Sequence, residues 1–382
     1  MIKLFYDTAP LEKFPCGVAV YTYSVLKQLL RYDNLEIHTG SKRLNPSGHR
    51  QLRDLVHDKI SADVKYHPIY FPGRFTPSSF CGLHPFSFNA GKYDIVHFTA
   101  HIMPPYVHFS SLDNAVLTIH DMFLWHTELG RELNQQEKHH VEALPVQAEK
   151  ARAIITCSEF SKREIVKYAG TDPEKIFVIP EAAQWNGEMI QREPEAIGRY
   201  GLEPQKYFLS VSSLDPHKNH LSLLEAFSAY HSSRQYAGEK LVLAGGRRSG
   251  DARTYQKIIS TPDVIHLQNV SESDLHQLFL NASGFFLLSV LEGFGLPLLE
   301  AMSCRIPACY ATGSSMDEIG RDAAYGVDAY DTDAVKELFM KFSAGGSEVE
   351  ARVEKAHRIS QEYTWAECAE KTYGLYRQLC GK

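Results

Sequence analysis

Two glutamates eight positions apart flank a glycine-containing turn in the segment SVLEGFGLPLLEAM, residues 289–302. The apolar run at 285–290 is typical of a buried strand of a parallel sheet, and Pro297 suits the first turn of a helix. We therefore expect Glu292 in a loop at the carboxyl end of a strand and Glu300 one turn inside the helix. Open α/β sheets bind ligands beyond the carboxyl ends of their strands, so the two carboxylates mark a candidate ligand site.

This turn has groups that could bind a nucleotide diphosphate. The helix start offers unpaired backbone N–H groups at the positive end of a dipole, and Gly293 and Gly295 let a phosphate approach them. The Glu300 carboxylate could accept two hydrogen bonds from a ribose diol, and Glu292 could reach a sugar beyond the diphosphate. The alternative is that Glu300 only complements the helix dipole and that Glu292 is solvated.

Basic residues follow two other strands of the same half of the chain. Lys218, within SVSSLDPHKNHLSLLEAF, lies between a strand and a helix, where its ammonium could neutralise a leaving diphosphate. Arg247 and Arg248, within LAGGRRSG, could add phosphate contacts. A basic residue in a turn is usually only solvated, and the nearby glutamates are what favour a binding role for Lys218.

The first half of the chain has two candidate residues of its own. Gly17, in PCGVAVY, opens a helix and could let a substrate approach, although a GxGxxG dinucleotide motif is absent. His120, in LTIHDMFLWH, is expected at a strand end, where it could bind a sugar hydroxyl or transfer a proton. The alternative for His120 is a hydrogen-bonded core histidine. The 18 histidines show no metal-ligand spacing, so we expect no metal site.

Strand and helix signals alternate along the whole chain, which predicts the α/β class with two mostly parallel, doubly wound sheets. A polar stretch at 181–205 is typical of a linker, so we expect two domains with a cleft between them. Capping boxes at Ser161–Glu164 and Ser271–Asp274 predict helix starts, and Gly170 predicts a helix end. The strands are expected at 3–8, 95–99, 115–120, 153–157, 207–212, 241–244, 264–270 and 285–290, and residues 177–180 close the first half.

The composition describes an ordinary globular protein of 382 residues, with 44% hydrophobic residues and a net charge of −6, which argues against nucleic-acid binding. No apolar run approaches the roughly 18 residues that span a bilayer. The start MIKLFYDTAP predicts a strand and not a signal peptide, and seven scattered cysteines favour free thiols in a reducing cytoplasm. We expect a cytoplasmic protein. The basic segment 41–53 is more typical of a solvated loop, and peripheral association with the inner face of a membrane is left open.

Three segments, IITCSEFSKREIVKYAG, PEKIFVIPEAA and LEGFGLPLLEAMSC, resemble glycosyltransferase family 4 enzymes, and the resemblance covers nearly the whole chain. It implies the GT-B fold, in which two Rossmann-like domains face a central cleft. Residues 1–190 would bind the acceptor and 191–364 the nucleotide sugar, with a helix at 365–382 returning to the N-terminal domain.

The family performs a retaining transfer of a sugar from a nucleotide diphosphate to an acceptor hydroxyl, without a cofactor or an essential metal. The resemblance implies that Glu300 binds the ribose, Glu292 the donor sugar, and Lys218 the diphosphate. It also implies donor-site roles for the backbone of Phe294, Gly295 and Leu296, for His120 and Gly17 from the first domain, and for Asn269 and Val270 at the base.

One departure from the family pattern concerns the diphosphate. Many members carry an arginine five residues before the lysine, where this chain has Ser213, and others have an arginine where it has His217. We therefore expect Arg247 or Arg248 to assist Lys218.

The sequence thus predicts a retaining hexosyltransferase of surface polysaccharide synthesis, acting on a glycan or lipid-linked acceptor. GDP-mannose is favoured as donor over a UDP-hexose. The alternatives are a nucleotide-sugar epimerase or a phosphorylase on the same fold, and a non-catalytic sugar-binding subunit. Retention of the anomeric centre during transfer would argue against an epimerase, a phosphorylase would need free phosphate, and turnover by the purified chain would exclude a non-catalytic role.

Overall fold

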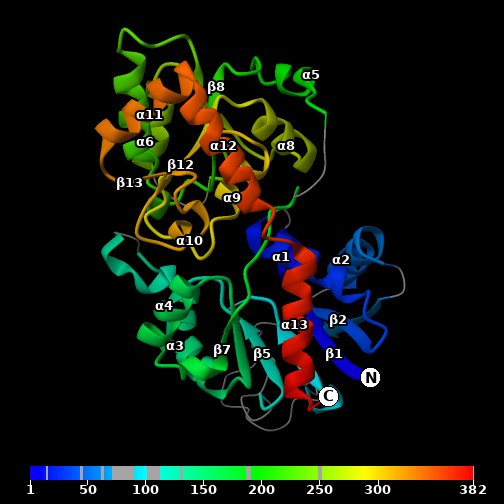
Figure 1. Cartoon of the computed structure of the whole chain (residues 1–382). Helices are drawn as coiled ribbons and strands as arrows, with labels where there is room; N and C mark the ends of the chain where they lie inside the picture. Colours follow the sequence, from blue (N-terminus) through cyan, green and yellow to red (C-terminus); the bar gives the residue numbers. More distant parts are fainter. Residues whose placement is uncertain are drawn as a thin grey trace. The chain divides into compact units, whose positions relative to one another are not determined.

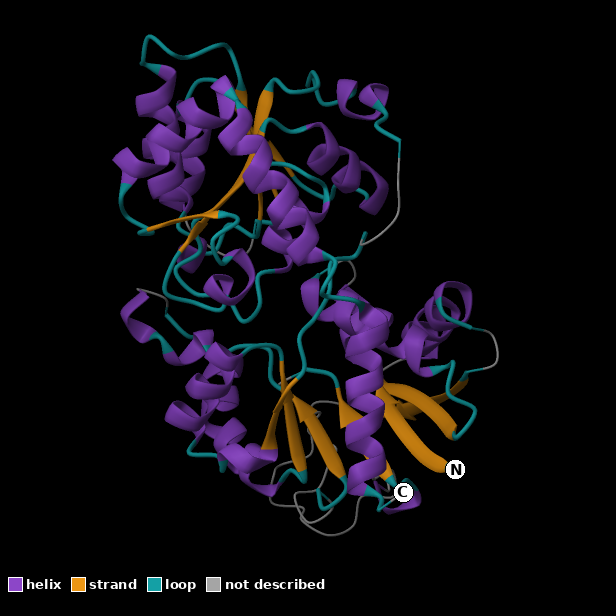
Figure 2. Cartoon of the chain, in the orientation of Figure 1, coloured by secondary structure: helices purple, strands orange, loops and turns teal. Residues whose placement is uncertain are grey.

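The computed structural model describes residues 1–13, 16–43, 46–61, 64–70, 90–100, 112–129, 132–185, 191–247 and 252–381. The chain divides into two compact units, coloured along the sequence in Figure 1. Unit 1 comprises Met1–Trp125, Leu133–Glu181 and Trp365–Lys382, and unit 2 comprises His126–Glu132 and Ala182–Thr364. In both units helices flank a sheet, as Figure 2 shows.

Unit 1 contains a seven-stranded sheet in the order β3-β2-β1-β4-β5-β6-β7, with all neighbouring strands parallel. The strands at Ile95–Phe98, Ala115–Thr118 and Ala153–Thr156 are four residues long and buried along their whole length, as expected when helices cover both faces. Its strands are β1 (Ile2–Asp7), β2 (Leu35–Arg43), β3 (Lys65–Tyr70), β4 (Ile95–Phe98), β5 (Ala115–Thr118), β6 (Ala153–Thr156) and β7 (Ile176–Val178).

The helices of unit 1 include the last helix of the chain. They are α1 (Gly17–Leu29), α2 (Pro46–Lys59), α3 (Gln135–Lys150), α4 (Glu159–Ala169) and α13 (Trp365–Leu379). Helix α13 packs against α1, with Leu375 and Tyr376 in the same buried cluster as Tyr21 and Leu26. The C-terminal segment is therefore part of the core of unit 1.

Unit 2 contains a six-stranded parallel sheet in the order β10-β9-β8-β11-β12-β13. Its strands are β8 (Tyr207–Val211), β9 (Lys240–Ala244), β10 (Val264–Leu267), β11 (Gly284–Leu287), β12 (Ala308–Ala311) and β13 (Tyr325–Val327). Its helices are α5 (Pro194–Gly198), α6 (His220–His231), α7 (Ala252–Ser260), α8 (Glu272–Asn281), α9 (Leu296–Ser303), α10 (Met316–Gly320), α11 (Thr332–Ala344) and α12 (Ser347–Ser360). The rings of Phe208, Phe286 and Phe339 contact one another in its core.

The alternation of strands and helices predicted both doubly wound sheets correctly, but some local details were wrong. Helix α4 begins at Glu159, because its cap is Ser158, three residues before the predicted Ser161; the Ser158 side chain accepts a hydrogen bond from the Ser161 N–H. The helix ends at Gly170, which has a φ of 65°, and Ser271 caps α8, both as predicted. The strand expected at 264–270 ends at Leu267, and Asn269 beyond it has a φ of 54°, which strands exclude.

Strands β2, β3, β12 and β13 were not predicted.

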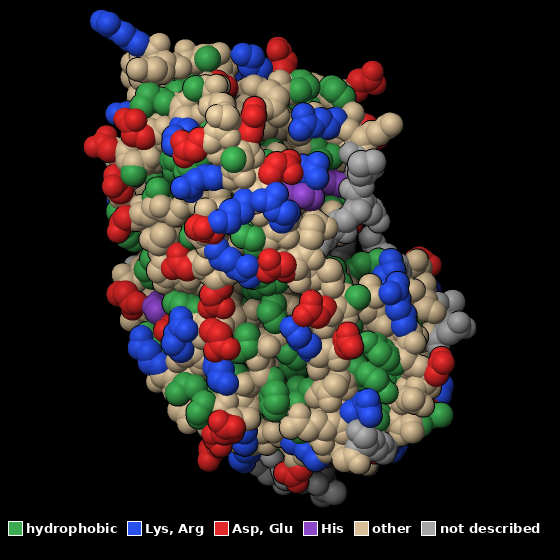
Figure 3. All heavy atoms as spheres, in the orientation of Figure 1, with side chains coloured by type: hydrophobic (Ala, Val, Ile, Leu, Met, Phe, Trp, Pro, Cys, Tyr) green, Lys and Arg blue, Asp and Glu red, His purple; other side chains and the backbone are tan. Residues whose placement is uncertain are grey.

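Acidic and basic side chains are interspersed over the face drawn in Figure 3. No helix within the described residues is long and apolar enough to cross a membrane.

Candidate active site

The turn before α9 has the backbone conformation that its glycines suggested. Gly295 is the N-cap of α9 and has a φ of 101°, a left-handed conformation that residues with a side chain rarely adopt. A Cβ atom at this position would lie 2.9 Å from the Cγ atom of Met316. The carbonyl of Gly295 accepts hydrogen bonds from the N–H groups of Leu298 and Leu299, so the first turn of the helix is formed directly on the glycine.

Lys218 and Glu292 lie 74 residues apart in sequence but form an ion pair, with 2.7 Å between Nζ and Oε1. Lys218 follows β8 and Glu292 follows β11, which are neighbouring strands of the sheet. Two backbone contacts fix their loops: the Val290 N–H donates to the carbonyl of His217, and the Ser315 hydroxyl donates to that of Glu292. The structure thus joins two side chains that the sequence assigned separately to the diphosphate and to the donor sugar.

Glu300, on the second turn of α9, is a buried carboxyl group. Its pKa is raised to about 8, chiefly by burial; the backbone N–H of Gln184 acts in the opposite direction, and the charge of Glu272 contributes to the rise. At neutral pH the group is therefore mostly protonated. A protonated carboxyl group has no charge with which to complement the helix dipole, which argues against that alternative for Glu300.

The segment that follows unit 1 packs over α8 near this carboxyl group. The Trp185 indole stacks on the His276 ring, with 4.5 Å between centroids and 4° between planes. The Gln184 side chain donates to the Glu272 carboxylate. The Gln184 backbone N–H and the Glu272 carboxylate therefore lie near the Glu300 carboxyl group.

Ser213 and Arg247, the positions considered for a second diphosphate contact, have other partners in the structure. Ser213, at the position of the family arginine, donates its hydroxyl to the Asp215 carboxylate at 2.5 Å. Arg247 is exposed and its guanidinium lies over the Tyr255 ring, 4.2 Å from the centroid. The loop that carries Arg247 contacts the loop of Lys218, because the Leu214 N–H donates to the Gly246 carbonyl. Arg248 lies outside the described residues.

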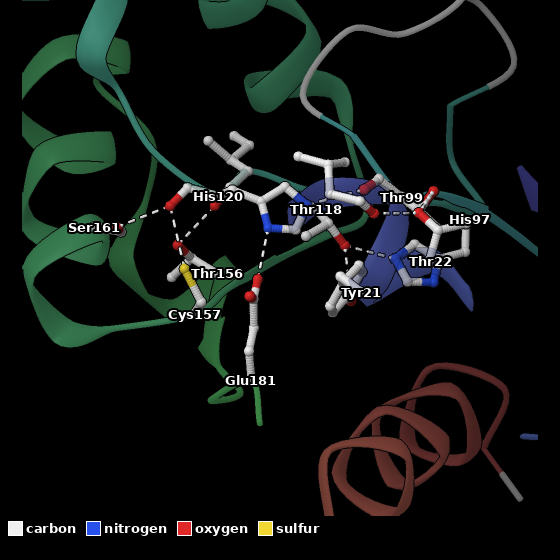
Figure 4. A network of polar contacts seen from close by, with 12 residues as sticks. Tyr21, Thr22, His97, Thr99, Thr118, His120, Thr156, Cys157, Ser161 and Glu181 are labelled. Atoms are coloured by element: carbon white, nitrogen blue, oxygen red, sulfur yellow. Dashed lines mark hydrogen bonds and ion pairs between the residues drawn. The ribbon is translucent and has the colours of Figure 1, made fainter. Parts of the chain in front are cut away.

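His120 follows β5 in unit 1, and both of its ring nitrogens have partners (Figure 4). Nδ1 lies 2.8 Å from a carboxylate oxygen of Glu181, and Nε2 lies 3.0 Å from the carbonyl oxygen of Thr99. The Tyr21 ring packs edge-on against the imidazole, with 4.9 Å between centroids. Burial acts to lower the pKa of His120, but the hydrogen bond and charge of Glu181 outweigh it and the pKa is raised.

The His120 surroundings also include groups that could bind a metal ion. Ligand atoms of His120, Cys157 and Glu181 all lie within 4.8 Å of one another. The Cys157 thiol donates to the His120 carbonyl, and burial raises its pKa well above the usual value, which opposes the thiolate that a metal needs. We therefore interpret the group as a hydrogen-bonded cluster. The chain has one Asp-x-Asp sequence, which begins with Asp331. The Asp331 carboxylate caps α11.

Two acidic residues of unit 1 were missed by sequence reasoning. Glu181 follows β7 and is bonded to His120, and Asp7 ends β1 with a side chain that is almost fully buried. Burial raises the pKa of Asp7 to about 7 against the effect of the Ala9 N–H, to which it is hydrogen-bonded. The Thr99 hydroxyl donates to the Asp7 carbonyl, so Thr99 links the ends of β1 and β5. The one sequence signal for either residue was its position just after an apolar strand.

Gly17 opens a helix as expected, whereas Asn269 and Val270 lie beyond the end of the strand in which they were expected. Phe294 and Leu296 adjoin Gly295, and the Phe294 ring contacts Tyr363 edge-on. Asn269 and Val270 lie in the loop between β10 and α8, and Gly17 is the first residue of α1. Their contacts with a donor stay a prediction.

Two doubly wound parallel sheets in one chain, with charged side chains after several strands, are the architecture expected of GT-B glycosyltransferases. The model for glycosyl transferases group 1 matches residues 193–362, and the model for glycosyltransferase family 4 matches residues 15–183. The chain belongs to glycosyltransferase family 4, group 1 type. It is thus a glycosyltransferase by family.

Curated relatives include several bacterial mannosyltransferases. The chain is 24% identical to the O-antigen chain mannosyltransferase B of Escherichia coli, over 99% of this chain and 100% of the relative. It is 28% identical to the O-antigen chain mannosyltransferase RfbU of Salmonella typhimurium over 43% of each chain. It is also 26% identical to the serotype-specific mannosyltransferase WbdA of Escherichia coli, over 58% of this chain but only 28% of that longer protein.

Solved structures share the fold over the whole chain. The HepE protein of Anabaena, crystallised with UDP and glucose, superposes with a TM-score of 0.71 at 15% identity, covering 99% of this chain and 100% of HepE. The sucrose-phosphate synthase of Thermosynechococcus elongatus gives a TM-score of 0.73 at 14% identity, with all of both chains covered. These likenesses confirm the GT-B fold.

Proposed function

We propose that the chain is a retaining, metal-independent hexosyltransferase that transfers mannose from GDP-mannose to a hydroxyl of a glycan or lipid-linked acceptor in surface polysaccharide synthesis. The mannosyltransferase relative that matches over its full length supports the choice of sugar and pathway. The observation that carries the proposal is the Lys218–Glu292 pair beside the Gly295 turn, with the buried Glu300 one turn further on.

Donor binding begins with the nucleotide in unit 2. The Glu300 carboxylate accepts hydrogen bonds from the two ribose hydroxyls, which requires the group to be ionised. The pKa of Glu300 is raised to about 8, chiefly by burial. Binding of the nucleotide at neutral pH therefore releases a proton from Glu300. The backbone of Phe294, Gly295 and Leu296 faces the diphosphate and sugar, and the backbone of Asn269 and Val270 holds the base.

The transfer step places negative charge on the diphosphate as the glycosidic bond breaks. Lys218 and the N-terminal end of α9 are the positive groups that stabilise this charge. Glu292 contacts hydroxyls of the donor sugar. The diphosphate therefore has to compete with Glu292 for the Lys218 ammonium, and Arg247 is the further cation on a contacting loop.

The test is a binding and transfer screen on the purified full-length chain. Thermal unfolding is measured with GDP, UDP and ADP, and sugar transfer with the matching nucleotide sugars and a mannose-terminated glycan. GDP at 100 times its dissociation constant should add about 2.7 kcal/mol of stability. Preference for UDP would show that the donor is a UDP-sugar and not GDP-mannose. Failure of all three nucleotides to bind would contradict the proposal.

A further inference from the structure

The Glu181 carboxylate is bonded to one side of the His120 ring, and both side chains are buried. The exposed fractions of the two side chains are 8% for His120 and 5% for Glu181. Glu181 follows β7 and is the last residue of unit 1 before the chain enters unit 2. The Oε1 atom of Glu181 lies 2.8 Å from Nδ1 of His120, within the range of a charge-assisted hydrogen bond.

The two partners of His120 together determine where its protons are. The Thr99 carbonyl oxygen can only accept a hydrogen bond, so Nε2 carries a proton and donates it. A carboxylate can only accept a hydrogen bond, so an ion pair between Glu181 and His120 places the second proton on Nδ1. A ring that donates from both nitrogens is an imidazolium, and the Glu181 carboxylate balances its charge.

The other groups around the ring fit this charge. Asp121, the next residue, favours the imidazolium through its charge. His97 does not compete with His120 for a proton. The pKa of His97 is lowered to about 3, mainly by burial and to a lesser extent by the charge of His120. Tyr21 and Cys157 are neutral, since burial raises the pKa of each well above its usual value. A buried imidazolium without Glu181 would be strongly disfavoured.

We propose that Glu181 is a positioning residue for sugar transfer, which holds His120 as a fixed imidazolium at the carboxyl edge of the unit 1 sheet. The inference rests on the proposed function, which places His120 in the transfer step, and adds the residue that sets its charge and orientation. Because both ring nitrogens already donate to protein acceptors, His120 contributes a fixed positive charge instead of a proton that moves to and from substrate.

Glu181→Gln tests the charge with little change of shape. The amide can donate to a neutral Nδ1 while Nε2 still donates to Thr99, so the ring keeps its orientation and loses its charge. We expect kcat at neutral pH to fall by about 10-fold or more, with less than about a twofold change in the KM for the nucleotide sugar. The alkaline limb of the kcat profile, where His120 loses its proton, should move to lower pH by about one unit or more.

Two further variants separate positioning from a general loss of structure. Glu181→Asp keeps the negative charge and should restore part of kcat and most of the alkaline limb. Asp121→Asn removes one negative charge beside the same ring, but its carboxylate bonds the Phe123 N–H and acts on His120 through charge. It should shift the alkaline limb less than Glu181→Gln does. A loss of kcat in Glu181→Gln without a shift of that limb overturns the proposal.

A measurement on the wild-type chain decides the charge state without any activity. Chemical shifts of the His120 ring nitrogens at pH 7 distinguish an imidazolium from either neutral tautomer. Two protonated nitrogens support the proposal, and a neutral ring overturns it even where Glu181→Gln fails to fold. If the wild-type chain transfers no sugar, the proposed function fails, and the ring shifts still decide whether Glu181 holds a charged His120.

Discussion

Each unit carries an acid–base pair at the carboxyl edge of its sheet, and the two pairs differ in what they can do. Lys218 and Glu292 in unit 2 are each 15% exposed and form an ion pair. His120 and Glu181 in unit 1 are 8% and 5% exposed, and the charge of the histidine depends on the pair itself. In our proposal, Lys218 exchanges the Glu292 carboxylate for a phosphate of the donor, whereas His120 keeps Glu181 as its partner throughout.

The largest effect should come from the exchangeable pair. Lys218→Ala removes the cation that faces the diphosphate, so kcat should fall by about 10²-fold or more and by more than donor affinity, since the charge on the leaving group grows during the reaction. Steady-state kinetics against the nucleotide sugar measure both. Lys336→Ala is the matched control, because its ammonium lies near Asp333 on α11.

Ser213→Arg tests whether the family position still faces the phosphates in this chain. If it does, the substitution should restore part of the activity of Lys218→Ala. No effect in either background would show that another cation, such as Arg247, has taken over.

The fixed pair is tested next by removing its ring. His120→Ala should lower kcat by about 10²-fold, because a positioned charged group leaves the transfer step, and should leave nucleotide binding to unit 2 unchanged. Calorimetric titration with GDP, alongside the transfer assay, separates the two. An equal loss of nucleotide affinity would contradict the division of roles between the pairs.

Glu300 should show an effect on binding that depends on pH. Glu300→Gln loses charge-assisted bonds to ribose worth about 1.5–3 kcal/mol, so nucleotide affinity should drop by about 10- to 150-fold at high pH. In the wild type, affinity should rise with pH up to about 8 and then level off, because the buried carboxyl must ionise. Calorimetry in buffers of different ionisation enthalpy should detect a released proton below pH 8. A nucleotide affinity that does not depend on pH would contradict the role of Glu300 in binding ribose.

The same carboxyl group has a predictable effect on stability. Its pKa is about 8 in the folded chain and about 4.5 otherwise, so folding takes up a proton and the stability it contributes falls as pH rises from about 4.5 to 8. Glu300→Gln should therefore raise the Tm of the ligand-free chain above pH 7 while weakening nucleotide binding. A lower Tm across this range would show that the buried carboxylate is stabilised by groups other than those found near it.

The smallest effect should be that of a chelator. The proposal uses protein groups to neutralise the diphosphate, so transfer should be unchanged in EDTA. Lost activity that returns with a divalent ion would contradict metal independence, and would direct attention to the His120, Cys157 and Glu181 cluster.

Local sequence signals predicted features that are determined locally. The strand before Glu292, the Gly295 turn and the Ser271 cap each depend on a few consecutive residues, and each was found. The misplaced start of α4 arose because two serines three positions apart both suit a cap, and the chain uses Ser158.

The pairings between distant residues could not be predicted in the same way. Lys218 meets Glu292 because β8 and β11 are neighbours in the sheet, and His120 meets Glu181 because the ends of β5 and β7 converge across β6. Neither strand order is encoded in a short segment. The burial that raises the pKa values of Glu300 and Asp7 is likewise a property of the packed core.

One measurement tests the central claim most directly. The purified chain is incubated with GDP-α-mannose and a mannose-terminated glycan, and the product is followed by proton NMR at the anomeric positions. The account predicts release of GDP together with a new α-linked mannose, and loss of that signal in Lys218→Ala. A β-linked product, or no transfer from any nucleotide sugar under conditions where GDP binds, would contradict it.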